Sequence, residues 1–310
     1  MARRTPSRQH AHEPAAQPPL LEMLTPDLAL RLQPTVCLQS GHTGLQQLDV
    51  LESASFGRLF RLDGCVMTTE ADEWVYHENL CHPAAIALPH PQRALIVGGG
   101  DGGSARQLLK HPTLREIVLC EIDAAVIAMA RNYLFTVHQG ALDDPHVQIV
   151  IADGAEYVTT ASAPFDLIVL DLTDPQGLAA ALYSADFFTA CARLLGQHGC
   201  LCLHLASPML HPERITALLV ELGKVFAIVR PYQIPVTLYG GSWTLACASQ
   251  QTDIAALTAE QVELQLAMRG IDNLQYYNGG THVGALALPN YLQRLCHAAL
   301  AAGKRATPAS

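Results

Sequence analysis

The sequence is poor in basic residues. It contains 19 Lys and Arg against 28 Asp and Glu, which gives a formal net charge of -9. A nucleic-acid partner requires clustered basic side chains for its phosphates. The one basic cluster, Arg3, Arg4 and Arg8, lies in a leader rich in Pro, Gln, Ala and His. We therefore expect no nucleic acid as a partner, whereas a small cationic ligand fits the acidic charge.

Long apolar runs and paired cysteines are absent as well. No apolar run reaches the roughly 18 residues that a membrane-spanning helix needs, and the N-terminus lacks the apolar core of a signal peptide. The nine cysteines include no CxxC pair, so a zinc site is not expected. These features predict a cytoplasmic protein with reduced thiols, no membrane contact and no bound metal.

The chain shows two successive patterns between a leader and a tail. Residues 1–25 predict a disordered leader, and residues 26–90 predict a small antiparallel β domain followed by a linking helix. Over residues 91–300, apolar strands alternate with helices, as in a parallel sheet covered on both faces. Residues 301–310 are expected to form a flexible tail. The predicted fold class is α/β: a Rossmann-like, doubly wound sheet of the methyltransferase type with a small N-terminal β domain.

A glycine-rich loop follows the first strand of the larger domain. The segment GGGDGG spans residues 98–103 and precedes a predicted helix, so its GxGxxG spacing is that of a nucleotide-binding loop. Glu121 ends the next strand, where an acid typically accepts hydrogen bonds from ribose hydroxyls. A tight turn followed by a solvated acid is the alternative. The glycines expected at the ligand are Gly98, Gly100 and Gly102.

An acid inside this loop narrows the choice of ligand. Asp101 would repel a pyrophosphate by about 4 kcal/mol for unit charges about 4 Å apart near a surface. It suits a positively charged nucleoside, such as S-adenosylmethionine or its decarboxylated form. Asp153 and Gly154 follow the third strand, where an acid can reach the adenine amino group. A helix N-cap is the alternative role for Asp153.

Two further acids end the fourth strand, in the segment LDLTDP. Ligands of open α/β sheets lie outside the carboxyl ends of the strands, so five acids should surround one crevice: Asp101, Glu121, Asp153, Asp171 and Asp174. The same loops contain no matching Lys or Arg, so we expect the substrates to supply the positive charge. The alternative is that Asp171 and Asp174 only shape an Asx-turn before Pro175.

The combined motifs resemble those of the polyamine aminopropyltransferases of the spermidine synthase type. The resemblance runs from about Gln46 to Tyr291 and rests on FGRLFRLDG, TTEADEWVYHE, IVGGGDGG, LKHP, CEID, DDP, DLTDP, LYSADFF and YYNGGTHVGALALPNY. It implies decarboxylated S-adenosylmethionine as a co-substrate, no tightly bound cofactor, and a homodimer or homotetramer. In this family, Asp101 would hold the aminopropyl ammonium, Glu121 the ribose and Asp153 the adenine, with Gln46 near the nucleoside.

The resemblance also assigns catalytic roles. It implies that Asp171 is the general base, that Asp174 holds the acceptor amine, and that Tyr76 orients the attacking nitrogen. His77 follows Tyr76 in the YHE motif and is assigned to substrate binding. The expected enzyme is therefore an aminopropyltransferase of polyamine biosynthesis, and putrescine, which gives spermidine, is the expected acceptor.

The sequence departs from the family pattern on the acceptor side. Met67 stands at a usual glutamine, and a second family glutamine falls at His204. The usual IPTYxxG reads IPVTLYGG, so either Leu238 or Tyr239 contacts the acceptor, and Tyr239 is the favoured choice. Spermidine, agmatine and cadaverine therefore remain open as acceptors.

Three other functions remain as alternatives. The first is a methyltransferase that uses intact S-adenosylmethionine, and the second is a nicotinamide-dependent dehydrogenase. The third is a non-catalytic polyamine-binding homologue. Asp101 in the glycine loop argues against the methyltransferase, and the intact pair Asp171 and Asp174 argues against the binding protein.

Overall fold

A computed structural model describes residues 19–33, 36–175 and 177–306. Its centre is a seven-stranded sheet in the order β12-β13-β11-β10-β7-β8-β9. β13 runs antiparallel to the strands on both of its sides, and all the other pairs are parallel. The strands of this sheet are β7 (Arg93–Gly98), β8 (Glu116–Glu121), β9 (Val147–Ile151), β10 (Phe165–Asp171), β11 (Leu195–Ala206), β12 (Ile228–Val236) and β13 (Gly241–Ser249).

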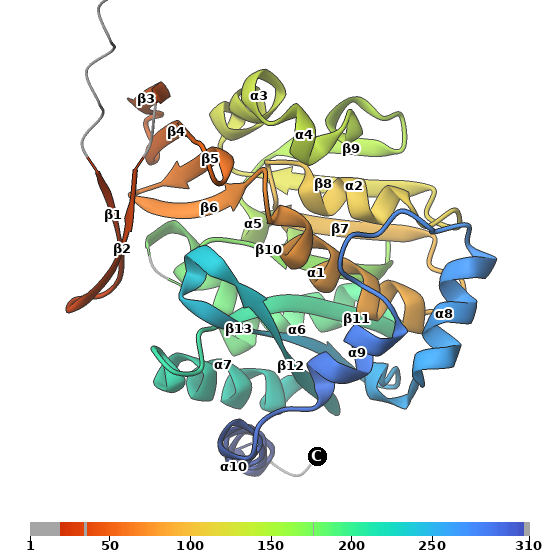
Figure 1. Ribbon diagram of the computed structural model, residues 1–310. Helices are drawn as coiled ribbons and strands as arrows, with labels where there is room; N and C mark the ends of the chain where they lie inside the picture. The colour runs from red at the N-terminus through yellow and green to blue at the C-terminus, as the bar shows by residue number, and fades with distance from the viewer. Residues whose placement is uncertain (1–18, 34–35, 176, 307–310) are drawn as a thin grey trace, which may run out of the picture.

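Helices cover both faces of this sheet (Figure 1). One face of the sheet is covered by α1 (Glu73–Ala87), α2 (Gly103–Leu109), α3 (Ala124–Tyr133) and the short α4 (Phe135–His138). The opposite face carries α5 (Gly154–Thr160), α6 (Ala185–Leu194), α7 (Pro212–Val225) and α10 (Asn290–Ala306). The remaining helices are α8 (Ala259–Met268) and α9 (Gly279–Leu286), and the 3₁₀ turns are η1 (Ala141–Asp143), η2 (Gly177–Tyr183), η3 (Thr237–Tyr239) and η4 (Ile254–Ala256).

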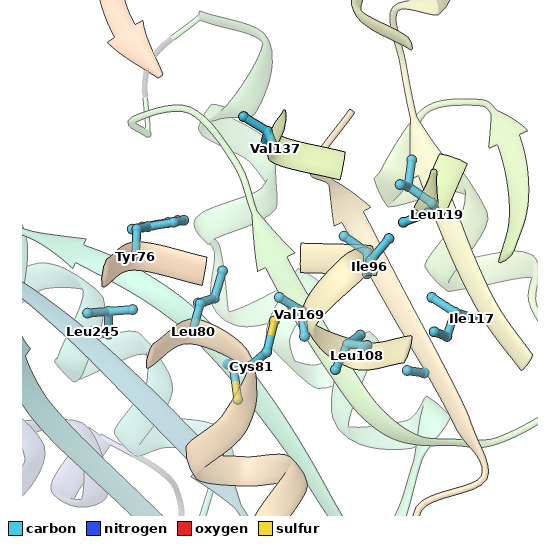
Figure 2. Packing of buried hydrophobic residues seen from close by; sticks show 14 of the residues in the cluster. Tyr76, Leu80, Cys81, Ile96, Leu108, Ile117, Leu119, Val137, Val169 and Leu245 are labelled. Atoms are coloured by element: carbon cyan, nitrogen blue, oxygen red, sulfur yellow. The ribbon is translucent and has the colours of Figure 1, made fainter. Parts of the chain in front are cut away.

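The two-sided burial follows from the alternation of side chains along each strand. In β7, Ala94 and Ile96 belong to the core under α1 and α2, whereas Leu95 and Val97 belong to the core under α5 and α6. Figure 2 shows the first of these cores, where Ile96 lies among side chains from the helices and neighbouring strands. A strand that buries both of its faces must be apolar throughout, so the predicted doubly wound α/β class is confirmed.

Six strands precede the linking helix within residues 19–33 and 36–69. A four-stranded antiparallel sheet contains β3 (Val36–His42), β4 (Gln47–Ser53), β5 (Gly57–Leu62) and β6 (Cys65–Thr69). A separate hairpin of β1 (Leu20–Thr25) and β2 (Leu28–Leu32) extends away from the body of the molecule (Figure 1). Both sheets precede α1 in the sequence, in the region where a small β domain was predicted.

Both predicted chain ends differ from the structure near their boundaries. The leader was expected to reach residue 25, but Leu20–Thr25 form β1, because LLEML pairs with the apolar LALRL of β2. Residues 1–18 lie outside the described residues. The tail was expected from residue 301, but α10 continues to Ala306, because its apolar positions pack along α7.

The structure also bears on what the sequence predicted about cysteines and membrane-spanning helices. All nine cysteines are free, and seven are buried, whereas Cys37 and Cys65 are exposed. None of the helices within the described ranges is both long enough and apolar enough to cross a bilayer.

The linking helix α1 is buried on almost every side. It carries Pro83 in its interior and places the ionisable side chains of Glu73, His77 and His82 inside the protein. A helix buried all round lies in the core of a protein rather than at its surface. Each buried polar group on such a helix needs a partner.

One such group begins a chain of hydrogen bonds that links three helices. His82 Nδ1 lies 2.9 Å from His111 Nε2, and His82 Nε2 lies 3.1 Å from the Gln107 side-chain oxygen. Arg269 Nη1 lies 3.0 Å from His111 Nδ1. Burial lowers the pKa of His82 to about 3 and that of His111 well below the usual value. Both imidazoles are therefore neutral donors and acceptors in the folded state.

We expect this network to make the fold sensitive to acid. Between the unfolded pKa near 6.5 and the folded pKa of about 3, the unfolded chain binds the proton that His82 refuses. Stability is therefore complete above pH 6.5 and falls as the pH drops, by about 2 kcal/mol for one such group between pH 7 and pH 5. Denaturant titrations at both pH values measure this loss.

His82→Asn is the matched variant, because its side-chain oxygen can accept the bond from His111 without titrating. Its free energy of unfolding should change less than that of the parent between the same two pH values. Equal changes in parent and variant would contradict the assignment.

Candidate active site

The site lies where the strand order of the sheet reverses. From β7 the chain proceeds outward through β8 and β9, and then returns to β10 on the other side of β7. The loops after β7 and β10 therefore diverge and leave a crevice at the carboxyl ends of the strands. The register places Asp171 opposite Gly98, so the acid of LDLTDP lies beside the glycine loop.

Glycine is required where these two loops touch. The Gly99 backbone N–H donates to the Asp171 carbonyl at 2.8 Å. Gly98 has a φ of 79°, and a Cβ there would lie 2.3 Å from the same carbonyl oxygen. Only a residue without a side chain permits this approach. The loop glycine thus fixes the position of Asp171 as well as the path of the ligand.

Asp101 is buried at the start of α2. Its Oδ1 accepts a bond from the Gly103 N–H at 2.9 Å, and its Oδ2 accepts one from the Thr68 hydroxyl. The His77 Nε2 atom lies 3.5 Å from Oδ2. Burial acts to raise the pKa of Asp101, but the His77 charge and the hydrogen bonds hold it at about 2. The carboxylate is therefore ionised.

His77 supplies a cation between the acids of the site. Its Nδ1 donates to Glu73 at 2.8 Å, and its Nε2 lies 3.9 Å from Asp171 as well as close to Asp101. Burial acts to lower the pKa of His77, but these carboxylates raise it well above the usual value. Arg106 holds Glu73 from the other side, at 2.8 and 2.9 Å.

These contacts correct one expectation. The loops contain no Lys or Arg, and we expected the substrates to supply the whole positive charge. The imidazolium of His77 already compensates Asp101 and Asp171, because α1 packs against the glycine loop. The donor atoms of the three side chains lie within 4.8 Å of one another, close enough for a metal. The raised pKa of His77 favours its protonated form between the two acids.

Asp171 is held by side chains of two helices that pack on the sheet. Ser104 donates its hydroxyl to Oδ2 at 2.7 Å. Burial and the neighbouring Asp101 raise the pKa of Asp171, whereas His77 and hydrogen bonds from Ser104 and Tyr76 act in the opposite direction. A carboxylate with a raised pKa accepts a proton more readily than one in water.

A cavity of about 140 Å³ joins four of the predicted acids. The predicted residues that line it are Gln46, Met67, Tyr76, His77, Gly98, Gly100, Asp101, Glu121, Asp153, Gly154, Asp171 and Tyr239. Gly102 is not among the residues that line this cavity. It has a φ of 80°, and a Cβ there would meet His138 and Leu142, so its role is in the packing of the loop.

The outer end of this cavity carries Glu121, Asp153 and Gln46. Burial raises the pKa of Glu121 to about 7, while the Asp123 N–H, 2.9 Å from Oε1, acts to lower it. Gln46 donates to Asp123 at 3.0 Å. Asp153 caps α5 through bonds from the Ala155 and Glu156 N–H groups to Oδ1. The N-cap alternative for Asp153 is thus observed, and the side chain still lines the cavity.

A second cavity, of about 360 Å³, adjoins the first. Met67, Tyr76 and Tyr239 line both, and Asp174 and His204 line the second alone. We expected all five acids around one crevice. Asp174 lies in the adjoining cavity instead, because the segment after Asp171 continues through Leu172 and Thr173, which line both cavities, to the second.

Aromatic rings form one wall of the second cavity. Tyr76 contacts Tyr239, which contacts Trp243, which stacks on His204 with ring centroids 5.7 Å apart. The Tyr239 hydroxyl donates to the Met67 carbonyl. Of the two candidate residues, Tyr239 lines both cavities, whereas Leu238 lines the second alone and packs in an apolar cluster. Rings of this kind suit a chain of methylene groups that ends in a cation.

The acceptor-side acid also has a cationic partner. Arg214 Nη1 lies 2.6 Å from Asp174 Oδ2. Arg214 lies near the start of α7, about forty residues along the chain from Asp174, so the loop sequence gave no sign of it. Sequence reasoning also missed the hydrogen-bond partners of the acids. Thr68 donates to Asp101, and Ser104 donates to Asp171. The same reasoning missed Glu73 and Arg106, which hold His77, and Tyr183, which bonds the Thr173 carbonyl and His204.

The comparisons with known proteins agree with this geometry. The Spermine/spermidine synthase domain matches residues 73–258. The chain belongs to this family. It is 43% identical to a polyamine aminopropyltransferase of Nitrosomonas europaea over 89% of this chain and 85% of the relative. It is 40% identical to one of Sodalis glossinidius over 81% and 87% of the two chains.

Solved structures of the family show the same fold. A spermidine synthase in complex with the transition-state analogue AdoDATO superposes with a TM-score of 0.85 and 35% identity, over 96% of this chain and 98% of that one. The spermidine synthase from Thermotoga maritima gives the same TM-score and identity over 94% and 98%. The resemblance drawn from the motifs, and the expectation of an aminopropyltransferase enzyme, are confirmed.

We expect nucleoside binding to depend on the charge of Glu121. Its carboxylate can accept both ribose hydroxyls, whereas its protonated form loses one acceptor oxygen. Because its pKa is about 7, the ionised fraction falls from about 0.9 at pH 8 to about 0.1 at pH 6. The dissociation constant of methylthioadenosine, measured by calorimetry, should therefore rise by up to about tenfold over this range.

Glu121→Gln is the matched control, since it keeps the shape of the side chain and cannot titrate. Its affinity should be weak and nearly independent of pH over the same range. A parent whose affinity stays constant from pH 6 to pH 8 would show that Glu121 does not hold the ribose.

Proposed function

We propose that this chain transfers the aminopropyl group of decarboxylated S-adenosylmethionine to a primary amine and releases methylthioadenosine. The observation that carries the proposal is the meeting of two cavities at Met67, Tyr76 and Tyr239. The first contains acids suited to a cationic nucleoside, and the second contains an acid and aromatic rings suited to an alkyl amine. Two substrates bound in this way would bring their reacting atoms together beside Asp171.

The nucleoside would extend along the first cavity. Glu121 would accept the ribose hydroxyls, and Asp153 with Gly154 would contact the adenine. Asp101 would accept the aminopropyl ammonium at the other end. His77 supports this arrangement, because one positive charge between two carboxylates leaves a net negative charge for the substrate.

The reaction is an in-line displacement at the methylene next to sulfur. The amine lone pair forms the new C–N bond, and the C–S bond electrons return to the sulfonium, which leaves as a neutral thioether. Before this attack, Asp171, which lines the first cavity, would accept the proton that the acceptor ammonium must lose to expose its lone pair. An alkyl ammonium with a pKa near 10.4 is only about 0.1% free amine near neutral pH, so this proton limits the nucleophile.

The acceptor would lie in the second cavity. Tyr76 and Tyr239 would flank the attacking nitrogen, and Asp174 would hold the distal end. We propose putrescine, which would give spermidine, and retain spermidine, agmatine and cadaverine as alternatives. Incubation with decarboxylated S-adenosylmethionine and this panel, followed by mass spectrometry of the products, tests the proposal. Transfer of a methyl group from intact S-adenosylmethionine would point instead to a methyltransferase.

We further propose a homodimer or homotetramer in the cytoplasm. The N-terminal strands expose Leu21, Met23, Leu28 and Val36, and apolar side chains grouped in this way are typical of an interface. The free thiols fit a reducing compartment. Sedimentation that finds only a monomer at working concentrations would contradict the oligomer.

Asp171 and Asp174 are expected to fail in different ways when changed. Asp171→Asn should lower kcat by roughly a hundred- to ten-thousand-fold, the range for loss of a general base, with a smaller change in acceptor KM. Asp174→Asn should raise the acceptor KM strongly, because the distal ammonium loses its counter-charge. Higher pH should partly restore Asp171→Asn, because free amine becomes more abundant.

The measurement is the pH–rate profile of both variants beside the parent. Parent activity should fall toward low pH as Asp171 becomes protonated, since its pKa is raised. If Asp171→Asn keeps the kcat of the parent at neutral pH, Asp171 is an acceptor ligand and not the base.

The departures from the family pattern should determine which amine is used. Met67→Gln should change the ratio of kcat/KM values among diamines of different length, because Met67 lines the second cavity. Nucleoside affinity should change little, since the charged groups that hold the nucleoside remain. An unchanged order of amines in both Met67→Gln and His204→Gln would show that these side chains do not contact the acceptor.

A further inference from the structure

An ion pair lies at the acceptor end of the second cavity. Arg214 of α7 approaches Asp174 of the loop after β10, with Nη1 and Oδ2 2.6 Å apart. The Arg214 side chain is 14% exposed and that of Asp174 is 41% exposed. Asp174 lines the cavity, and Arg214 stands behind it, outside the residues that line either cavity.

The rings beside this pair confirm its place in the cavity wall. The Tyr183 hydroxyl donates to the Thr173 carbonyl at 2.8 Å, and His204 Nε2 lies 2.7 Å from the same hydroxyl. Burial lowers the pKa of His204, with Asp174 raising it and Arg214 lowering it further. His204 and Tyr183 therefore lie within the electrostatic range of both members of the pair.

The pair changes the charge that an acceptor meets. A lone carboxylate at Asp174 would attract the distal ammonium of a diamine with a full negative charge. With Arg214 at 2.6 Å, the two charges nearly cancel at a distance, and the ammonium must share the carboxylate with the guanidinium. Two other acids line this cavity: the exposed Asp63, and the buried Glu22, which lies 3.9 Å from Arg61 and is partly compensated as well.

We infer that Arg214 is a positioning residue that sets acceptor specificity. It holds Asp174 at the end of the cavity and weakens the attraction of that carboxylate for the distal ammonium of the acceptor. This chain therefore discriminates less strongly between a diamine and an amine with an uncharged polar end than a free Asp174 would. The inference rests on the proposed function, because it takes the second cavity as the acceptor site.

The test compares two competitors of equal length, 1,4-diaminobutane and 4-aminobutan-1-ol. Only the first carries a distal ammonium. Their affinities are measured by calorimetry on the full chain saturated with methylthioadenosine, so that no turnover is needed. Arg214→Gln keeps a hydrogen-bond donor near Asp174 and removes the charge. Its preference for the diamine over the monoamine should rise about tenfold above that of the parent, the effect of one nearby charge at a partly exposed site.

Three further variants separate charge from structure. Arg214→Lys keeps the charge and should keep the preference of the parent. Arg230→Gln makes the same change in net charge at the pair with Asp253, on an edge strand of the sheet, and should also match the parent. In Asp174→Asn, the preference should fall below that of the parent, because the distal ammonium then meets the Arg214 charge without the carboxylate.

The preference ratio decides the outcome. A ratio in Arg214→Gln equal to that of the parent overturns the inference. A lower ratio also overturns it, because it would mean that Arg214 only supports the loop. An equal increase in Arg230→Gln also overturns it. Failure of the proposed function would look different: the parent would transfer no aminopropyl group to any amine of the panel.

Discussion

The site depends on the balance of charge between buried acids and a few cations brought from other elements. Asp101 and Asp171 lie close enough to repel each other, and the His77 imidazolium lies between them. Glu73 and Arg106 hold that imidazole from its far side. Without this charge the two acids could not both be ionised in a buried site, and neither could serve its own substrate group.

The same arrangement explains why α1 is buried on nearly all sides. The helix must reach from the N-terminal sheet to the glycine loop with a charged side chain in its core. Its contact with the loop is close, because a Cβ at Gly103 would lie 2.3 Å from the His77 ring. The helix, the loop and the strand that ends in Asp171 therefore form one rigid support. Catalysis by positioning requires such a support.

The two halves of the site have different degrees of constraint. On the nucleoside side, backbone N–H groups and short loops hold Asp101 and Asp153. On the acceptor side, Asp174 is more exposed and is held by the long Arg214 side chain. The departures from the family pattern, Met67 and His204, also line the acceptor cavity. The departures from the family pattern therefore lie in the half of the site that rests on side chains.

The local sequence by itself determined the fold class and the meeting of four acids in one cavity. Strands that are apolar on both faces specify a covered parallel sheet, and acids at their carboxyl ends must meet at one edge. The predicted boundaries of the leader and the tail were wrong, because they depend on contacts between elements. β1 pairs with β2, and the last turn of α10 belongs to a helix that packs on α7. Only the tertiary structure decided which cationic side chains lie beside these acids. His77 and Arg214 approach Asp171 and Asp174 across large separations in the sequence, and no local pattern records contacts made by packing.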